Sequence, residues 1–194
     1  MIVRLLVQPR MFAQELFLSA GVLLIGYSAF NVATRYVYQA YENRAFDQAL
    51  ARRPAAPRPA ATLDRSLVGK IDIPRLNISA IVKEGVGERT LDVAVGHIPH
   101  TALPGQSGNV GVAAHRDTLF RNLKDVRRDD KITLTTLDGE YVYRVVSTKI
   151  VQPTDVSVLE PSPNENTLTL VTCYPFYFVG NAPKRFVVRA LQVF

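Results

Sequence analysis

The sequence predicts a mainly β domain, folded as a closed or nearly closed barrel, behind an N-terminal membrane-spanning helix. Two observations support this fold class. From residue 66 onward the chain holds about eight short apolar or alternating segments with few helical patterns between them, which is typical of small β-barrels. Before them, residues 16–34 form a run of 19 residues without a charged side chain.

Residues 16–34 are long enough to cross a bilayer. As a helix they span about 28 Å, close to the roughly 30 Å hydrocarbon core of a membrane. A cleaved signal peptide has a shorter apolar region followed by a small-x-small site, and this run continues through Phe30 and Asn31 without one. A buried amphipathic helix would contain charges, and none occurs here. We therefore expect residues 1–35 to be a cytoplasmic tail and an uncleaved transmembrane signal anchor.

The charges around this run indicate its orientation. Arg4 and Arg10 precede it, while Arg35 and Arg44 follow it among acidic residues. The slight positive bias places the N-terminus in the cytoplasm. The sequence thus predicts a single-pass protein of the cytoplasmic membrane whose folded domain is extracytoplasmic.

Residues 36–65 are predicted to link the anchor to the folded domain. Residues 36–50 have a helical composition, so they either extend the membrane helix or pack on the later domain. Prolines at 54, 57 and 59 prevent a stable helix and favour a semi-rigid extended spacer. The boundary is expected near residues 64–66, which leaves 66–194 as the folded domain.

The strands of this domain are predicted from alternation and turn signals. Asp138-Gly139 separates two such segments, and its preference for positive φ predicts a hairpin. Asp117 is expected to cap a short helix over residues 117–123. Strands are predicted at residues 69–73, 78–82, 109–114, 131–137, 141–146, 148–151, 167–172 and 186–193.

Composition excludes some classes of function. The formal charge of +6 is spread along the chain without a dense basic stripe, which argues against nucleic-acid binding and is explained by solubility. The single cysteine, Cys173, has no partner for an intrachain disulfide, so its thiol stays available.

Three chemically useful side chains fall at the edges of predicted strands. Cys173 ends one strand shortly before Pro175, His115 ends a second, and Arg185 opens a third. A rigid sheet could bring a nucleophile, an acid/base and a fixed positive charge together in this way. Each residue also has a plain explanation: a cysteine packed in the core, a histidine in a surface turn and an arginine at a solvated strand edge.

Several motifs, in order and at suitable spacing, resemble the sortase family of cysteine transpeptidases, and class D in particular. The resemblance runs from about Val68 to Val193 and implies the eight-stranded sortase barrel. The motifs are GKIDIP at 69–74, GHIP at 96–99 with LPG at 103–105, GNVG at 108–111 leading into AHR at 114–116, TLVTC at 169–173, and RFVVRA at 185–190.

The resemblance implies a role for each candidate residue. Cys173 would be the nucleophile, because a thiolate attacks a carbonyl and a nearby imidazole or guanidinium favours the thiolate. His115 would be the acid and then the base. Arg185 would stabilise the oxyanion, and Thr172 would line the peptide groove beside the nucleophile.

The remaining histidines are expected to be structural or accessory. His97 and His100 lie in a Pro/Gly-rich segment, neither is expected to terminate a strand, and neither matches the histidine of the family motif. No cofactor and no metal site are expected, because paired cysteines and a His-x-x-x-His helix are absent from the sequence and no dense acidic cluster predicts calcium.

Three hypotheses remain open at this stage. The first is a membrane-anchored transpeptidase that cleaves a Leu-Pro-x-Thr-Gly or Leu-Pro-x-Thr-Ala signal near the C-terminus of secreted proteins. It would pass the acyl group to an amine acceptor of cell-envelope or pilin type. The second is a cysteine peptidase whose thioacyl intermediate is hydrolysed by water. The third is a noncatalytic extracytoplasmic barrel that binds peptides.

Overall fold

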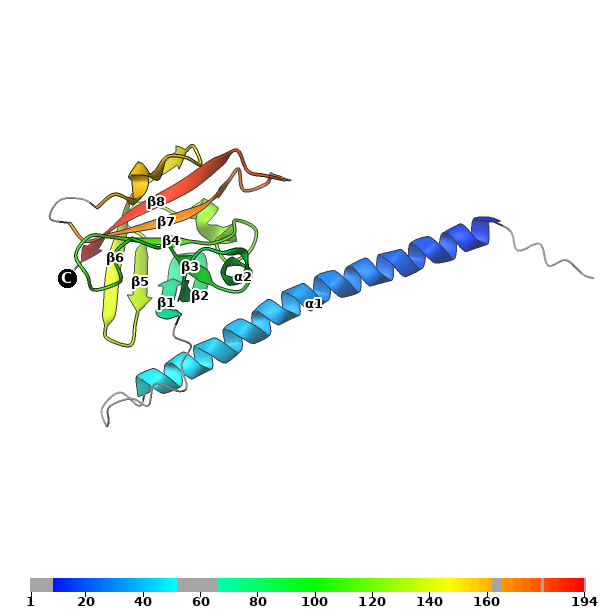
Figure 1. Cartoon of the computed structure of the whole chain (residues 1–194), viewed down its shortest axis with the longest axis horizontal. Coiled ribbons are helices and arrows are strands. Elements are labelled where there is room, and N and C mark those ends of the chain that lie inside the picture. The colour runs from blue at the N-terminus through cyan, green and yellow to red at the C-terminus, as the bar shows by residue number, and fades with distance from the viewer. Residues whose placement is uncertain (1–8, 52–65, 162–164, 179, 194) are drawn as a thin grey trace, which may run out of the picture. The chain divides into compact units, whose positions relative to one another are not determined.

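The computed structural model describes residues 9–51, 66–161, 165–178 and 180–193 (Figure 1). The chain divides into two compact units, Met1–Tyr38 and Gln39–Phe194. The predicted Pro-rich spacer at 53–61 and positions 64 and 65 of the predicted boundary lie outside the described residues. The division into an anchor (1–35), a linker (36–65) and a catalytic domain (66–194) therefore stays a prediction.

The N-terminal helix α1 (Pro9–Ala51) is 43 residues long. Within Phe12–Ala51, the most apolar stretch has a mean hydropathy of 1.8, and none of it is buried. By length and composition, this helix can cross a membrane. The helix predicted for 36–50 is confirmed as part of α1.

The last part of α1 packs against the barrel within the second unit. The Gln39 side chain donates a hydrogen bond from Nε2 to the carbonyl of Val93 at 2.6 Å, and its Oε1 accepts from the N–H of Ile81 at 3.1 Å. Phe46 has no exposed surface. The end of α1 therefore contributes to the folded barrel domain. The predicted domain boundary at residue 66 does not include these residues.

We expect the Phe46→Ala variant to be destabilised by about 3 kcal/mol, because a fully buried ring is replaced by a cavity. Urea unfolding of the full-length protein in detergent, followed by circular dichroism, measures this change. Tyr41→Ala is the matched control, since the Tyr41 ring on the same helix is 71% exposed. Equal stabilities of the two variants would contradict the packing of Phe46.

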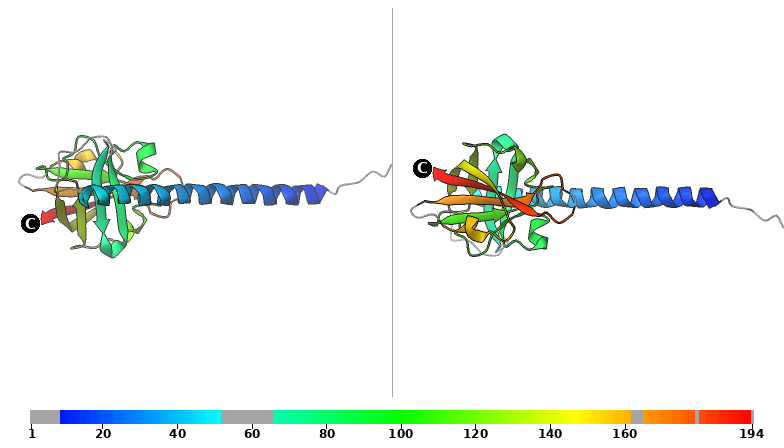
Figure 2. Two further views of the ribbon diagram at one scale, coloured as in Figure 1. Left: turned by 90° about the horizontal axis from the view of Figure 1, so that it is seen from below. Right: turned by 90° about the horizontal axis from the view of Figure 1, so that it is seen from above.

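Eight strands form a closed barrel in the order β1-β2-β3-β4-β7-β8-β6-β5, which confirms the predicted fold class (Figure 2). The neighbours β2–β3 and β4–β7 are parallel, and the other pairs are antiparallel. The strands are β1 (Leu67–Ile73), β2 (Ile78–Glu84), β3 (Val95–His97), β4 (Asn109–Ala113), β5 (Lys131–Thr135), β6 (Glu140–Val151), β7 (Thr167–Tyr174) and β8 (Lys184–Val193).

Apolar side chains at alternate strand positions fill the barrel. Tyr143 is among them, and burial, with a smaller contribution from the charge of Tyr141, raises the pKa of Tyr143 to about 12. On β4 and β7 consecutive residues are buried, because these strands are covered on both faces. Among the buried core residues are Val110, Val112, Leu168, Leu170, Val188 and Ala190.

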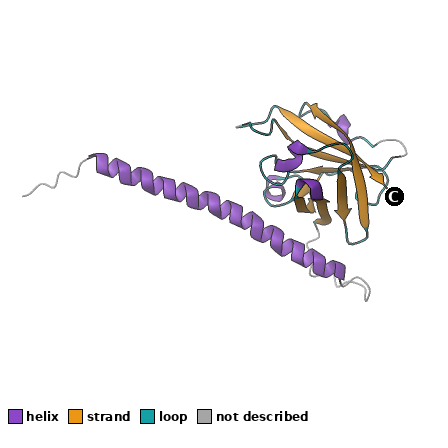
Figure 3. Ribbon diagram, turned by 180° about the vertical axis from the view of Figure 1, so that it is seen from behind, coloured by secondary structure: helices purple, strands orange, loops and turns teal. Residues whose placement is uncertain are grey.

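Short helical segments lie between the strands (Figure 3). They are η1 (Pro74–Leu76), α2 (Glu88–Leu91), η2 (Arg121–Asp125) and η3 (Val156–Leu159). The expected cap by Asp117 is wrong: η2 begins after Phe120, with no side-chain cap. Phe120 and Leu123 are fully buried, so packing of these two side chains positions the segment.

The strand predictions differ from the structure in three places. Strand β3 was not predicted, because three residues between loops give too short a pattern. Strand β6 is continuous where two strands, 141–146 and 148–151, were expected; a register shift against β8 between Val145 and Ser147 absorbs the break in alternation. The β5–β6 hairpin is confirmed, but Gly139 does not adopt the positive φ that predicted it. The turn is held by the Thr136 hydroxyl, which accepts hydrogen bonds from the N–H groups of Asp138 and Gly139.

A charged network joins the β1–β2 turn to the segment before β5. The Arg75 guanidinium binds both carboxylate oxygens of Asp130, and the Arg75 Nη2 also donates to the carbonyl of Asp125 at 2.6 Å. The buried carboxylate accepts a further bond from the N–H of Arg127 at 2.8 Å. The hydrogen bond from Arg75, followed by that from Arg127, lowers the pKa of Asp130.

This lowered pKa predicts acid-sensitive stability. The stabilisation is fully present above the ordinary aspartate pKa of about 3.9 and is lost as the pH falls through the lower value of the folded state. Asp130→Asn should therefore be less stable at neutral pH and lose less stability on acidification, as urea midpoints between pH 7 and pH 2 will show. Asp138→Asn, at an exposed position, is the control. Parallel pH profiles for Asp130→Asn and the unmodified protein would refute the assignment.

Candidate active site

Cys173 is the second-last residue of β7 and carries a free, partly exposed thiol. The strand ends at Tyr174, directly before Pro175. Leu168 and Leu170 point into the hydrophobic core, so alternation along β7 places Cys173 on the opposite, outer face. The thiol is therefore accessible where the strand gives way to a loop.

His115 lies beside this position because β4 runs parallel to β7. The pairing ends with Ala113 opposite Val171, and the N–H of Ala114 then donates to the carbonyl of Val171 at 3.3 Å. His115 is the next residue after Ala114, and Cys173 is the second residue after Val171. The two residues therefore follow the paired part of β4 and β7 side by side. The imidazole is partly exposed, with 38% of the side-chain surface accessible.

Arg185 is the residue directly opposite Cys173 in the antiparallel pairing of β7 with β8. Directly opposed residues point to the same face of a sheet, so the guanidinium shares the outer face with the thiol. Its Nη1 donates to the carbonyls of Ala182 at 3.2 Å and Lys184 at 3.0 Å. Figure 1 shows β4, β7 and β8 as neighbours, in agreement with the barrel order.

The structure thus brings the three predicted residues to one end of three adjacent strands. Among the described residues, no hydrogen bond joins the three side chains to one another. Cys173 and Arg185 are a directly opposed pair on one face of the sheet, and His115 follows the end of β4 at the level of Cys173. The arrangement offers a nucleophile, an acid/base and a permanent cation around one patch of surface.

Thr172 is placed differently from the groove-lining position that the sequence predicted. Its side chain is buried, with 3% of the residue exposed, and Oγ1 donates to the carbonyl of Ala114 at 2.7 Å. A side chain inside the barrel has almost no surface to offer a peptide. Thr172 instead ties β7 to the residue that precedes His115.

Asp92 is a neighbour of His115 that the sequence analysis did not single out. Its Oδ1 lies 3.9 Å from Nε2 of the imidazole, and its side chain is 63% exposed. This distance is too long for a hydrogen bond, so the contact is an ion pair only when His115 is protonated. Residues 92 and 115 lie far apart in the sequence, and no local pattern links them.

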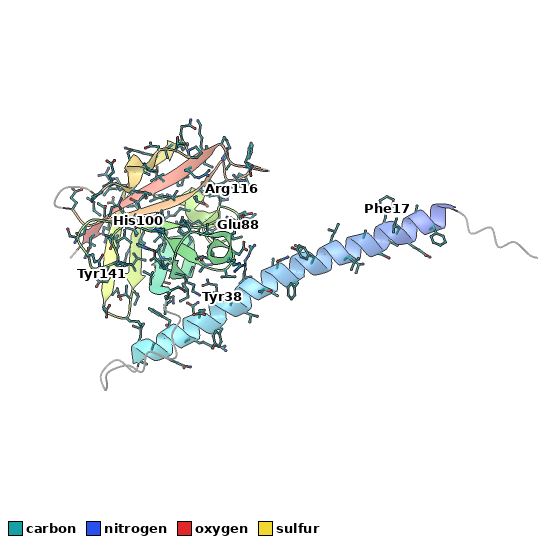
Figure 4. The ribbon with its side chains drawn as sticks, viewed as in Figure 1. Phe17, Tyr38, Glu88, His100, Arg116 and Tyr141 are labelled. Atoms are coloured by element: carbon teal, nitrogen blue, oxygen red, sulfur yellow. The ribbon has the colours of Figure 1, made fainter. Side chains whose placement is uncertain are left out.

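His97 and His100 do not join the site. His97 ends β3, so the expectation that it does not terminate a strand is wrong, but its ring is buried and its nitrogens contact Glu84 Oε2 at 2.7 Å and the carbonyl of Ala102 at 3.0 Å. Figure 4 shows His100 away from Arg116, the residue that follows His115. Within the described residues, no group of three or more His, Cys, Asp or Glu side chains could hold a metal ion.

A thiol, an imidazole and a guanidinium thus lie at one end of adjacent strands of a closed barrel. The Sortase domain family matches residues 71–193, and the chain belongs to this family of cysteine transpeptidases. The predicted resemblance to sortases is thereby confirmed.

Relatives of known name agree with this assignment. Sortase D of Bacillus subtilis is 36% identical over 125 residues, which is 64% of this chain and 63% of that protein. Sortase A of Bacillus anthracis is 28% identical over 191 residues, which is 89% of each chain. The matched part covers less than two thirds of Sortase D. The match to Sortase D supports the predicted resemblance to class D.

Solved structures share the fold. The Sortase D5 transpeptidase of Clostridium perfringens superposes with a TM-score of 0.66 at 24% identity, over 80% of this chain and 99% of that one; at this identity the likeness shows the fold alone. Sortase C1 of Streptococcus agalactiae gives a TM-score of 0.63 at 28% identity, over 78% of this chain and 86% of that one.

Removing the Thr172 hydroxyl should loosen the connection between β7 and the His115 segment. In Thr172→Val the shape is nearly kept, but the carbonyl of Ala114 loses its donor inside the protein, which costs about 1–2 kcal/mol. Thermal and urea unfolding measure this loss. Thr148→Val, at an exposed position of β6, is the matched control. If both variants unfold at the same urea concentration, the bond has no structural weight.

Proposed function

We propose that the protein is a membrane-anchored sortase that cleaves a sorting signal through a thioacyl intermediate on Cys173 and transfers the acyl group to an amine. The main support is the register that sets Cys173 opposite Arg185 on β8 and beside His115 at the end of β4. Membership in the sortase family supports the same chemistry.

The first half of the reaction forms the thioacyl enzyme. The Cys173 thiolate attacks the carbonyl of the scissile peptide bond, and a carbon–sulfur bond forms as the carbonyl oxygen takes the negative charge. Arg185 stabilises this oxyanion. Because Nη1 already donates to the carbonyls of Ala182 and Lys184, Nε and Nη2 are the nitrogens that donate to the oxyanion. Collapse breaks the carbon–nitrogen bond, and protonated His115 gives its proton to the leaving amine.

The second half transfers the acyl group. The incoming amine attacks the thioester carbonyl, neutral His115 takes the proton that the amine loses, and Cys173 leaves as the thiolate. Proton and electron counts return to their starting values, so no redox partner is needed. Water in place of the amine would give the hydrolytic outcome of a peptidase.

The substrates are proposed from the family resemblance. We infer that secreted proteins with a C-terminal Leu-Pro-x-Thr-Gly or Leu-Pro-x-Thr-Ala signal supply the acyl group and that an amine of cell-envelope or pilin type accepts it. Helix α1 supports a single-pass anchor, and the charge bias around residues 16–34 favours an extracytoplasmic barrel.

Product analysis tests the proposal directly. Full-length protein in detergent is incubated with signal peptides, with and without an amine, and the products are weighed by mass spectrometry. We expect a ligated product whose yield rises with amine concentration at the expense of hydrolysis. A hydrolysis yield that does not change with any amine would favour the peptidase. Absence of turnover with every peptide would favour the noncatalytic barrel.

Variants test the assigned roles. Cys173→Ala should abolish turnover with the fold intact, because no other group forms the thioester. His115→Ala should lower kcat/KM by about 10²–10⁴-fold and Arg185→Ala by about 10²–10³-fold, which are the usual contributions of a general acid/base and an oxyanion donor. Lys131→Ala, at an exposed position of β5, is the control. Full activity in Cys173→Ala would eliminate the mechanism.

A further inference from the structure

The connection between β7 and β8, residues 175–183, links Cys173 to Arg185. Its beginning is fixed by aromatic packing at the end of the barrel. Phe176 packs against the core, with its ring centroid 5.3 Å from that of Phe186 and 6.2 Å from that of Tyr174. This packing holds the first residues of the connection from the inside.

Arg116 holds the same connection from the outside. Its Nη2 donates to the carbonyl of Phe178 at 2.6 Å and to the carbonyl of Gly180 at 3.1 Å. The guanidinium carbon also lies 5.9 Å from the centroid of the Phe178 ring, within the range of a cation–π contact. Arg116, labelled in Figure 4, follows His115 directly, so its side chain joins the segment that carries the imidazole to the connection that follows β7.

Lys124 on η2 provides a second outer contact. Its ammonium donates to the Tyr177 hydroxyl and lies 5.1 Å from the centroid of that ring. Tyr177 is 77% exposed, so this contact is accessible to water and contributes less stability than a buried one.

Backbone pairing does not replace these contacts. Among the described residues of 175–183, none forms a backbone-to-backbone hydrogen bond outside the β7–β8 ladder. Cationic side chains therefore carry most of the polar attachment of the connection. Arg116 contributes two charge-assisted bonds and a ring contact, which a lysine with its point charge cannot reproduce together.

We propose that Arg116 is a positioning residue that fixes the β7–β8 connection beside His115. The connection forms one wall of the candidate site, and Arg116 keeps this wall ordered before an extended peptide binds. The inference rests on the proposed function, because it assigns the ordered wall to peptide binding. Without Arg116, peptide binding must also order the connection, which raises KM. Peptide that is already bound reacts as before, because Cys173, His115 and Arg185 are unchanged.

The first measurement does not depend on catalysis. The chain contains no tryptophan, so Phe178→Trp introduces a single emission reporter and keeps the carbonyl that Arg116 binds. In this background, Arg116→Ala should shift the emission to longer wavelength and increase acrylamide quenching. Arg116→Lys should lie between the two, and Arg128→Ala, at an exposed arginine of the segment before β5, should change nothing.

The second measurement is the kinetics of the full-length protein, without the reporter, on a signal peptide and an amine. Loss of a charge-assisted bond should raise KM for the peptide about tenfold in Arg116→Ala, with kcat within about twofold. The alkylation rate of Cys173 by iodoacetamide, a probe too small to need the wall, should stay unchanged. Arg116→Lys should recover part of the KM. A purely structural role would lower kcat, thiol reactivity and the unfolding temperature together.

The outcomes separate the two proposals. Unchanged emission and quenching in Arg116→Ala would show that Arg116 does not hold the connection, and a changed emission with unchanged KM would show that the ordered wall does not serve peptide binding. Either result overturns the inference. If Arg116→Ala does not fold, Arg116→Gln takes its place with the same expected direction. Absence of turnover in the unmodified protein would instead remove the proposed function and the peptide-binding part of the inference.

Discussion

The parallel pairing of β4 with β7 is the constraint on which the candidate site depends. Side chains alternate between the two faces of a strand, so a slip of one residue would turn Cys173 inward and Thr172 outward. The bond from Thr172 Oγ1 to the carbonyl of Ala114 opposes such a slip, because it forms only in the observed register. The antiparallel pairing with β8 then places Arg185 opposite the thiol. One buried hydroxyl thus helps to set which residues reach the surface.

Much of the barrel could be predicted from the sequence, because long alternating strands leave a strong pattern. The positions of Cys173, His115 and Arg185 at strand ends were also predictable, since each follows or opens such a pattern. Strand β3 was missed because three residues carry no periodicity, and its last residue, His97, was taken for a loop residue. Thr172 was placed on the wrong face of the sheet. Its position next to a nucleophile does not show to which face its own side chain points.

Contacts between distant segments could not be predicted at all. Asp92 approaches His115, and Arg116 reaches the β7–β8 connection, only because the barrel closes. The charge of the chain gives a related lesson. Its basic residues are scattered in the sequence and were explained by solubility, yet Arg75, Arg116 and Lys124 each bind a specific partner. Scattered cations in a β protein can therefore be attachment points for loops that lack ladder bonds.

The packing of the end of α1 has a consequence for proteolysis between the helix and the barrel. Gln39 bridges two backbone groups of the barrel domain, and Phe46 is fully enclosed, although both precede the segment that leads to β1. A protease that cuts between Ala51 and Ser66 would break the covalent tether and leave these contacts intact. Separation of the helix from the barrel would then require these contacts to break as well.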